Sequence, residues 1–171
     1  TDDVAAAVVK ELLARSGLDA ALIEDVIVGC AFPEGEQGFN LARMLTFLSG
    51  LPNSVAGVTI NRFCGSSMQA IHDAAGRIAM GAGEAFVCGG VESMTRVPMT
   101  GFNPMPNPRL ANEYPEAFMS MGITAENLAE RHDISRERQE EFAVESHRKA
   151  EAARSAGSFS GEIVAIETEG E

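Results

Sequence analysis

Short apolar or β-branched runs alternate with segments of helical periodicity over the first 90 residues, and this alternation constrains the fold most strongly. It predicts strands at residues 25–30, 55–60 and 85–88, and helices at residues 2–16, 40–48 and 64–80. Thr1 is the expected N-cap of the first helix, acids follow in its first turn, and Gly17 ends it. The α-β-α-β-α-β order indicates an α/β fold with a mostly parallel sheet covered by helices.

The pattern changes after residue 93. Five of the seven prolines lie between residues 98 and 115, interleaved with methionine and phenylalanine, so we expect a functional loop there, with a disordered linker as the alternative. Beyond it the sequence predicts a short helix from Thr124 to His132, a long charged helix from Ser135 to about residue 156, and a strand at 162–166.

Composition excludes several classes of protein. The 171 residues carry 25 acidic and 13 basic side chains, a net charge of −12, so no basic stripe for nucleic acid is expected. No apolar run reaches 18 residues, so we expect no membrane span. Three sparse cysteines argue against a secreted disulfide framework and favour a reducing compartment. The chain opens directly on a helix and closes soon after a short apolar stretch, so we expect a piece of a longer protein.

The segment 58–69, Val-Thr-Ile-Asn-Arg-Phe-Cys-Gly-Ser-Ser-Met-Gln, is the most informative for chemistry. A strand leads into a sharp turn, and Cys64 falls at or next to the first turn of the following helix. The positive end of a helix dipole favours a thiolate there, and the same N–H groups could receive a developing oxyanion. Gly65, Ser66 and Ser67 leave room for a substrate. The alternative is that Cys64 is a small buried apolar side chain.

The helix after Cys64 carries no base of its own for this thiol. His72 lies eight residues on, about 12 Å along the helix, beyond hydrogen-bond reach. Asp73 and Arg77 are spaced for an i,i+4 ion pair. The opposite side of the helix is expected to pack closely within the protein, and it carries Met68, Ile71, Ala75, Ile78 and Ala79.

Other ligand sites have little support in the sequence. His132 and His147 have no cysteine or histidine at metal-ligand spacing, so we expect no metal site. The glycine clusters at 81–83 and 89–90 lack the spacing of a dinucleotide-binding loop. Cys30 and Cys88 are expected to be core residues.

Four motifs occur in order along the chain and together resemble the thiolases. They are Asn-Arg-Phe-Cys-Gly-Ser-Ser-Met-Gln-Ala at 61–70, Gly-Gly-Val-Glu-Ser-Met at 89–94, Ser-Met-Gly-Ile-Thr-Ala-Glu-Asn at 120–127, and Ile-Ser-Arg-Glu at 134–137 with Ser146-His147. The sequence is most similar to the degradative 3-ketoacyl-CoA thiolases (acetyl-CoA acyltransferases) of bacterial fatty-acid β-oxidation. A ketoacyl synthase also places a cysteine at a helix start, but 61–67 has the thiolase pattern.

The resemblance implies a function and a site. Cys64 would be the nucleophile that cleaves a 3-ketoacyl-CoA and carries the acyl group until free CoA removes it. Met121 matches a methionine that lines the acyl pocket, and Ser120 stands where biosynthetic thiolases have a histidine, which favours the degradative branch. The implied co-substrate is coenzyme A, with no permanently bound cofactor. The alternatives are a biosynthetic acetyl-CoA acetyltransferase and a non-catalytic fragment or interaction module.

The resemblance also implies an incomplete thiolase. Residues 1–92 would form the N-terminal α/β half without its first strand, 93–134 a segment of the loop domain, and 135–171 the charged helix and returning strand of that half. The family's C-terminal half, with its general-base histidine, second cysteine and oxyanion-supporting asparagine, has no counterpart here, so this piece alone is expected to be inactive.

Expected partners follow from the family. They are acyl-CoA and CoA, a second copy in a homodimer or homotetramer, and a complex with other β-oxidation enzymes, in the cytoplasm. Because the chain is acidic, most cationic contacts to the CoA phosphates are expected from the missing half, with Arg109 as a local candidate.

Overall fold

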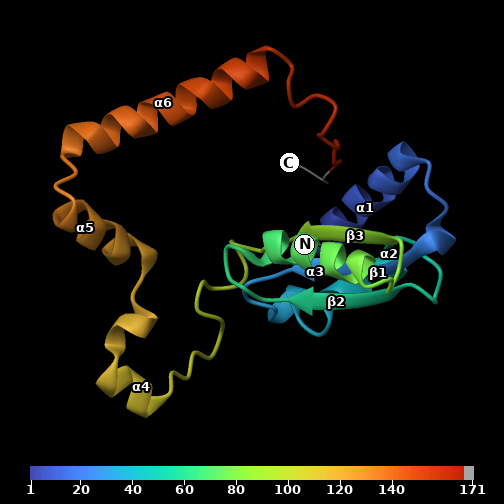
Figure 1. Ribbon diagram of the computed structural model, residues 1–171, viewed down its shortest axis with the longest axis horizontal. Helices are drawn as coiled ribbons and strands as arrows, with labels where there is room; N and C mark the ends of the chain where they lie inside the picture. Colours follow the sequence, from blue (N-terminus) through green and yellow to red (C-terminus); the bar gives the residue numbers. More distant parts are fainter. Residues whose placement is uncertain (168–171) are drawn as a thin grey trace. The chain divides into compact units, whose positions relative to one another are not determined.

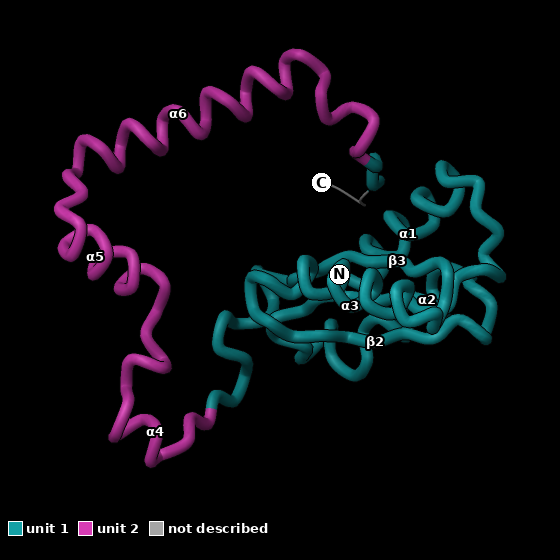
Figure 2. Tube along the Cα trace, viewed as in Figure 1, with its two compact units in different colours: residues 1–104, 164–171 teal, residues 105–163 magenta. Residues whose placement is uncertain are grey.

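The computed structural model describes residues 1–167 and divides them into two compact units. One unit comprises residues 1–104 with the stretch from residue 164, and the other comprises residues 105–163 (Figure 2). The first unit holds all three strands and the segment around Cys64. The boundaries predicted from the resemblance, at 92/93 and 134/135, differ from this division and stay a prediction.

The first unit is an α/β structure built on a parallel sheet (Figure 1). Its elements, in chain order, are α1 (Asp2–Ser16), the 3-10 turn η1 (Ala20–Leu22), β1 (Ile23–Gly29), η2 (Gly35–Gln37), α2 (Leu41–Leu48), β2 (Ala56–Ile60), α3 (Ser66–Ala79) and β3 (Ala85–Gly90). The predicted strands and helices of residues 1–90 are confirmed. The strand order is β2-β1-β3, and β1 pairs in parallel with both neighbours.

Helices cover both faces of the sheet because side chains of the central strand alternate between two cores. Val26 and Val28 of β1 belong to a core with α1 and α2, which contribute Ala6, Val9, Ala42 and Leu45. Ile27 belongs to a second core with Ala70 and Ala74 of α3. The described residues of this unit therefore form three layers, with α1 and α2 on one face and α3 on the other (Figure 1).

Helix ends follow from specific residues. Gly17 adopts a left-handed conformation (φ 64°), and its N–H donates to the Leu13 carbonyl oxygen, which ends α1 as predicted. Thr1 occupies the N-cap position of α1 but makes no side-chain capping bond; its hydroxyl donates to the Glu36 carboxylate instead. Asn40 caps α2 by accepting from the Arg43 N–H.

The side of α3 that faces the sheet differs from the prediction. Ala70 and Ala74 are buried, whereas Met68, Ile71 and Ile78 are at least half exposed in the described part of the chain. The reason is close approach: a Cβ on Gly29 of β1 would lie 2.6 Å from the Ser66 backbone, so only small α3 residues fit against the sheet.

The predicted Asp73–Arg77 ion pair is also wrong. Asp73 accepts a hydrogen bond from Gln69 Nε2 at 2.6 Å. Arg77 Nη1 lies 2.5 Å from Oδ2 of Asp25, a buried residue of β1. A buried carboxylate needs a cation more than an exposed one does, and this explains the choice of partner.

The second unit is helical. It contains α4 (Pro108–Glu113), the 3-10 turn η3 (Pro115–Phe118), α5 (Met121–Arg131) and α6 (Arg136–Ser155). The predicted charged helix is confirmed as α6, with Ser135 as its N-cap. The proline-rich segment is not purely irregular, because Asn107 caps a short helix that begins at Pro108. The predicted helix at 124–132 begins earlier, at Met121, because Ser120 rather than Thr124 is its N-cap.

The predicted strand at 162–166 does not form. Glu162 lies in a turn, and residues 163–167 have no regular secondary structure. Apolar alternation alone does not make a strand, because a strand needs a partner to satisfy its backbone hydrogen bonds. The last residues of the chain, 168–171, lie outside the described part.

None of the helices in the described residues is both long enough and apolar enough to cross a lipid bilayer.

Candidate active site

The candidate site lies at the carboxyl edge of the sheet. Gly29, the last residue of β1, is in register with Ile60 of β2 and with Gly90 of β3, so the three strands end at one edge. Ligands of open α/β sheets bind outside this edge. Cys64 follows β2 by four residues and therefore belongs to this edge.

The turn between β2 and α3 is held by its own polar groups. Asn61 Oδ1 accepts from the Phe63 N–H at 2.8 Å, and the Gly65 N–H donates to the Arg62 carbonyl oxygen at 3.0 Å. Phe63 has a φ of 45°, in the left-handed region that bulky residues rarely adopt. Such a conformation persists only where the surroundings hold it, and these bonds do so.

Ser66, the first residue of α3, stabilises the same turn through two hydrogen bonds of its side chain. Its hydroxyl accepts from the Arg62 N–H at 2.9 Å and donates to the Phe63 carbonyl oxygen at 2.6 Å, and the residue is buried. From the sequence we expected Ser66 only to leave room for substrate. Its structural role was missed because both bonds depend on the shape of the turn.

Cys64 is exposed and lies next to Gly65, the N-cap of α3. The expected position, at or next to the first helical turn, is therefore confirmed, and the alternative of a buried apolar cysteine is wrong. The thiol therefore lies in the solvent beside the N-terminus of a 14-residue helix, where a substrate can reach it.

The other two cysteines have a different environment. Cys30 is buried, and burial together with the negative charge of Glu92 raises its pKa to about 11. Cys88 is half-buried, its thiol donates to the Ala70 carbonyl oxygen at 3.4 Å, and burial raises its pKa. Both groups stay protonated near neutral pH and are poor nucleophiles.

His72, which the spacing places beyond hydrogen-bond reach of Cys64, is exposed and lies at the end of the second turn of α3. In residues 1–167, no group of three metal-ligating side chains could hold an ion.

Two buried or half-buried polar side chains near the strand ends were not singled out from the sequence. Glu92 follows β3 by two residues and receives hydrogen bonds from the loop after β1, and Gln37, which is fully buried, donates to it at 2.6 Å. The signal in the sequence was a carboxylate two residues after the Gly-Gly end of a strand. Its partners, 55 to 62 residues away, could not be identified from spacing.

Ser120 and Met121 belong to the other compact unit. Ser120 caps α5 by accepting from the Ile123 N–H at 3.4 Å, and Met121, the first residue of α5, is exposed. Their place beside the Cys64 thiol stays a prediction. Arg109 lies on α4 and forms an exposed ion pair with Glu113 at 3.8 Å.

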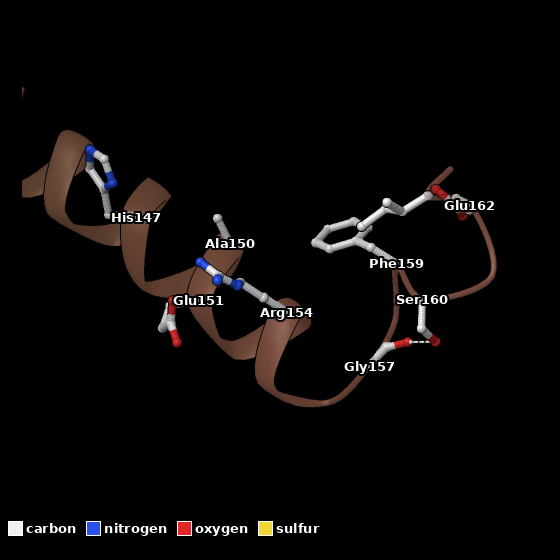
Figure 3. A pocket seen from close by; sticks show the side chains of 9 residues that line it. His147, Ala150, Glu151, Arg154, Gly157, Phe159, Ser160 and Glu162 are labelled. Atoms are coloured by element: carbon white, nitrogen blue, oxygen red, sulfur yellow. Dashed lines mark hydrogen bonds between the residues drawn. The ribbon is translucent and has the colours of Figure 1, made fainter. Parts of the chain in front are cut away.

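An open hollow also lies within the second unit, between the end of α6 and the turn that follows it (Figure 3). The Ser160 hydroxyl closes this turn by donating to the Gly157 carbonyl oxygen at 2.8 Å. The hollow is lined by His147, Ala150, Glu151, Arg154, Gly157, Phe159, Ser160, Glu162 and Ile163. It contains no cysteine and shares no residue with the Cys64 turn.

Comparison with known proteins agrees with the motifs. A family model described as thiolase, N-terminal domain, matches residues 1–171. Proteins named 3-ketoacyl-CoA thiolase from Bacillus subtilis and Pseudoalteromonas translucida are 48% and 51% identical to the chain, each over 97% of its length. One of the same name from Shewanella denitrificans is 49% identical over 97%.

The matched region covers 42% or 43% of each of these relatives, so the chain spans less than half their length. The family match nevertheless extends over the whole chain and includes the strand, turn and helix around Cys64. The chain therefore belongs to the thiolase family, of which it carries the N-terminal domain.

Proposed function

We propose that this chain is the nucleophile-bearing part of a CoA-dependent acyltransferase that cleaves 3-ketoacyl-CoA to acyl-CoA and acetyl-CoA. The proposal rests on Cys64, which is exposed and lies in a hydrogen-bonded turn beside the N-cap of α3. The chain that contains it belongs to the thiolase family. The names of its relatives supply the substrate class. The degradative direction rests on Ser120, and the physiological setting we propose is fatty-acid β-oxidation.

The proposed reaction has two steps. The Cys64 thiolate attacks the 3-keto carbon, the bond between C2 and C3 breaks, and its electron pair leaves on C2 as the enolate of acetyl-CoA, which takes up a proton. The acyl group remains on Cys64 as a thioester. The thiolate of free CoA then attacks this thioester, which releases acyl-CoA and regenerates Cys64. Cysteine suits both steps because its thioester is close in energy to that of CoA.

Proton transfer and enolate stabilisation need groups beyond the Cys64 turn. We assign the general base, the second cysteine and the oxyanion-supporting asparagine to the part of the protein that corresponds to the rest of the relatives' length. Ser120 and Met121 are proposed to contribute to the acyl pocket. Because the chain has a net charge of −12, the CoA phosphates are assigned mainly to the remaining part as well, with Arg109 as a local candidate.

The exposed side of α3 supports a larger assembly. Met68, Ile71 and Ile78 are 57%, 60% and 50% exposed, which is costly in water for a row of large apolar side chains on one helix. We propose that the rest of the thiolase covers them. A homodimer or homotetramer, a complex with other β-oxidation enzymes and a cytoplasmic location are further parts of the proposal; the location rests on the three free cysteines.

A thiolysis assay on the full-length protein containing this chain tests the proposal. The Cys64→Ala variant should lose at least about a thousandfold in kcat with acetoacetyl-CoA and CoA, because the thiolate that forms the acyl-enzyme is removed. The matched control is Cys88→Ala, which removes a half-buried thiol under α3 and should retain turnover. Turnover that persists in Cys64→Ala would overturn the proposal, and a full-length protein without turnover would favour a non-catalytic module.

A further inference from the structure

We propose that Glu92 and Asn61 are positioning residues for the Cys64 thiol. In this role the Glu92 carboxylate binds the loop that follows β1. Asn61 is hydrogen-bonded both to this loop and to the turn before Cys64, so the position of the thiol depends on both residues. This inference rests on the proposed function in that Cys64 is the reacting group, and it adds the residues that hold it.

The Glu92 carboxylate accepts hydrogen bonds from several residues that follow β1. Its Oε2 accepts from the Ala31 N–H at 2.7 Å, and its Oε1 accepts from the Phe32 N–H at 3.3 Å and from Gln37 Nε2 at 2.6 Å. The Cys30 thiol also points to Oε1, at 3.7 Å. Both oxygens are thus in use, and hydrogen bonds to an ionised carboxylate are the stronger kind.

Gln37 makes this arrangement rigid. Its side chain is fully buried; its Nε2 also donates to the Phe32 carbonyl oxygen at 2.7 Å, and its Oε1 accepts from the Ser93 N–H at 2.7 Å. Every polar atom of the amide therefore has a partner. A buried network in which each member is satisfied fixes one arrangement of the chain.

Asn61 connects this network to the turn. Its Nδ2 donates to the Ala31 carbonyl oxygen at 2.8 Å, and its Oδ1 accepts from the Phe63 N–H at 2.8 Å. One side chain thus joins the loop held by Glu92 to the left-handed Phe63, the residue just before Cys64. The rings of Phe32 and Phe63, with centroids 5.9 Å apart, make a second connection between the same two segments.

The expected consequence of breaking this path is a loosened turn. A glutamine at position 92 replaces one accepting oxygen with an NH2 group. In one amide orientation this group faces the Ala31 N–H, and in the other it faces the N–H groups of Phe32 and Gln37, so a hydrogen bond is lost in either case. Alanine at position 61 removes both bonds of the Asn61 amide. In both cases the left-handed conformation of Phe63 is held less firmly, and the Cys64 thiol leaves its place beside the N-terminus of α3 more often.

The test measures alkylation of the full chain by iodoacetamide, with peptide mass spectrometry to report each cysteine separately. We expect Glu92→Gln and Asn61→Ala each to slow alkylation of Cys64 about fivefold, and the double variant to be no slower than about either single one, since both act on one path. The matched control is Glu36→Gln, which alters a carboxylate bound to Ser93 and Arg96 but not to the Ala31 or Asn61 segments.

Cys88 reports the state of the fold in the same samples. Its rate should stay within twofold of wild type in every variant; a parallel rise at Cys88 would mean general loosening and would overturn the proposal. Additive effects in the double variant, or a Cys64 rate within twofold of wild type in Glu92→Gln, would also overturn it. Alkylation does not require turnover. A failed thiolysis assay would therefore refute the proposed function, but it would not change the alkylation rates that test this inference.

Discussion

Arg77 Nη1 of α3 lies 2.5 Å from Asp25 Oδ2 of β1, and this ion pair joins the helix that follows the nucleophile to the central strand. Asp25 is buried, and its Oδ1 has no hydrogen-bond partner among the described residues. The pair is therefore the main compensation for a charge inside the fold.

Removal of the cation should destabilise the protein. We expect Arg77→Met to lower the free energy of unfolding by about 2 kcal/mol, less than for a fully buried pair because the Arg77 side chain is 35% exposed. Urea unfolding measures the change. The double variant Asp25→Asn with Arg77→Met should recover at least half of the loss, since it removes the stranded charge; a single variant as stable as wild type would contradict this.

Glu36 should make stability depend on pH. The Ser93 hydroxyl and Arg96 bind its carboxylate and hold its pKa at about 2, below the ordinary 4.5. A lowered pKa in the folded state stabilises the protein above the unfolded value and loses this effect as pH falls from about 4.5 to about 2. Wild type should therefore exceed Glu36→Gln in unfolding free energy at pH 6, and the difference should shrink across that window. A difference that is constant from pH 2 to 7 would be inconsistent with it.

Gly29 sets the approach of α3 to the sheet. A Cβ at this position would lie 2.6 Å from backbone and side-chain atoms of Ser66. We expect Gly29→Ala to cost about 2 kcal/mol or more in unfolding free energy, because the helix start must shift. Gly89→Ala is the matched control in a neighbouring strand, since its Cβ meets nothing within 4 Å, and it should change stability by less than about 1 kcal/mol. Equal effects of the two substitutions would refute the packing argument.

The elements of residues 1–90 were predictable because their periodicity is local. The side of α3 that meets the sheet was not, since apolar spacing favoured Met68 and Ile71, while the actual contact requires the small Ala70 and Ala74 against Gly29. A helix face depends on what it packs against, and the sequence pattern alone does not contain that information.

The candidate site, like the fold, could be predicted only in part from the sequence. The position of Cys64 beside a helix start could be predicted from the strand, turn and helix pattern around it. The contacts that hold it could not, because Asn61 reaches Ala31 across 30 residues and Gln37 reaches Glu92 across 55. The strand expected at 162–166 failed for the related reason that pairing depends on a distant partner.

The three cysteines should react at different rates. Near neutral pH, iodoacetamide should label Cys64 at least about tenfold faster than Cys30 or Cys88, because Cys64 is exposed and burial raises the pKa of the other two thiols. Peptide mass spectrometry after short labelling times measures the three rates. In denaturant the differences should disappear, and equal labelling in the native protein would contradict the assignment of Cys64.

The acyl-enzyme on Cys64 can be detected directly. The full-length protein is incubated briefly with 3-ketoacyl-CoA without added CoA, quenched with acid and analysed by peptide mass spectrometry. We expect an acyl thioester on the peptide that contains Cys64; it should be lost when CoA is added before the quench and should be missing in Cys64→Ala. An acyl group on Cys88 or Cys30, or turnover without any acylated Cys64, would contradict it.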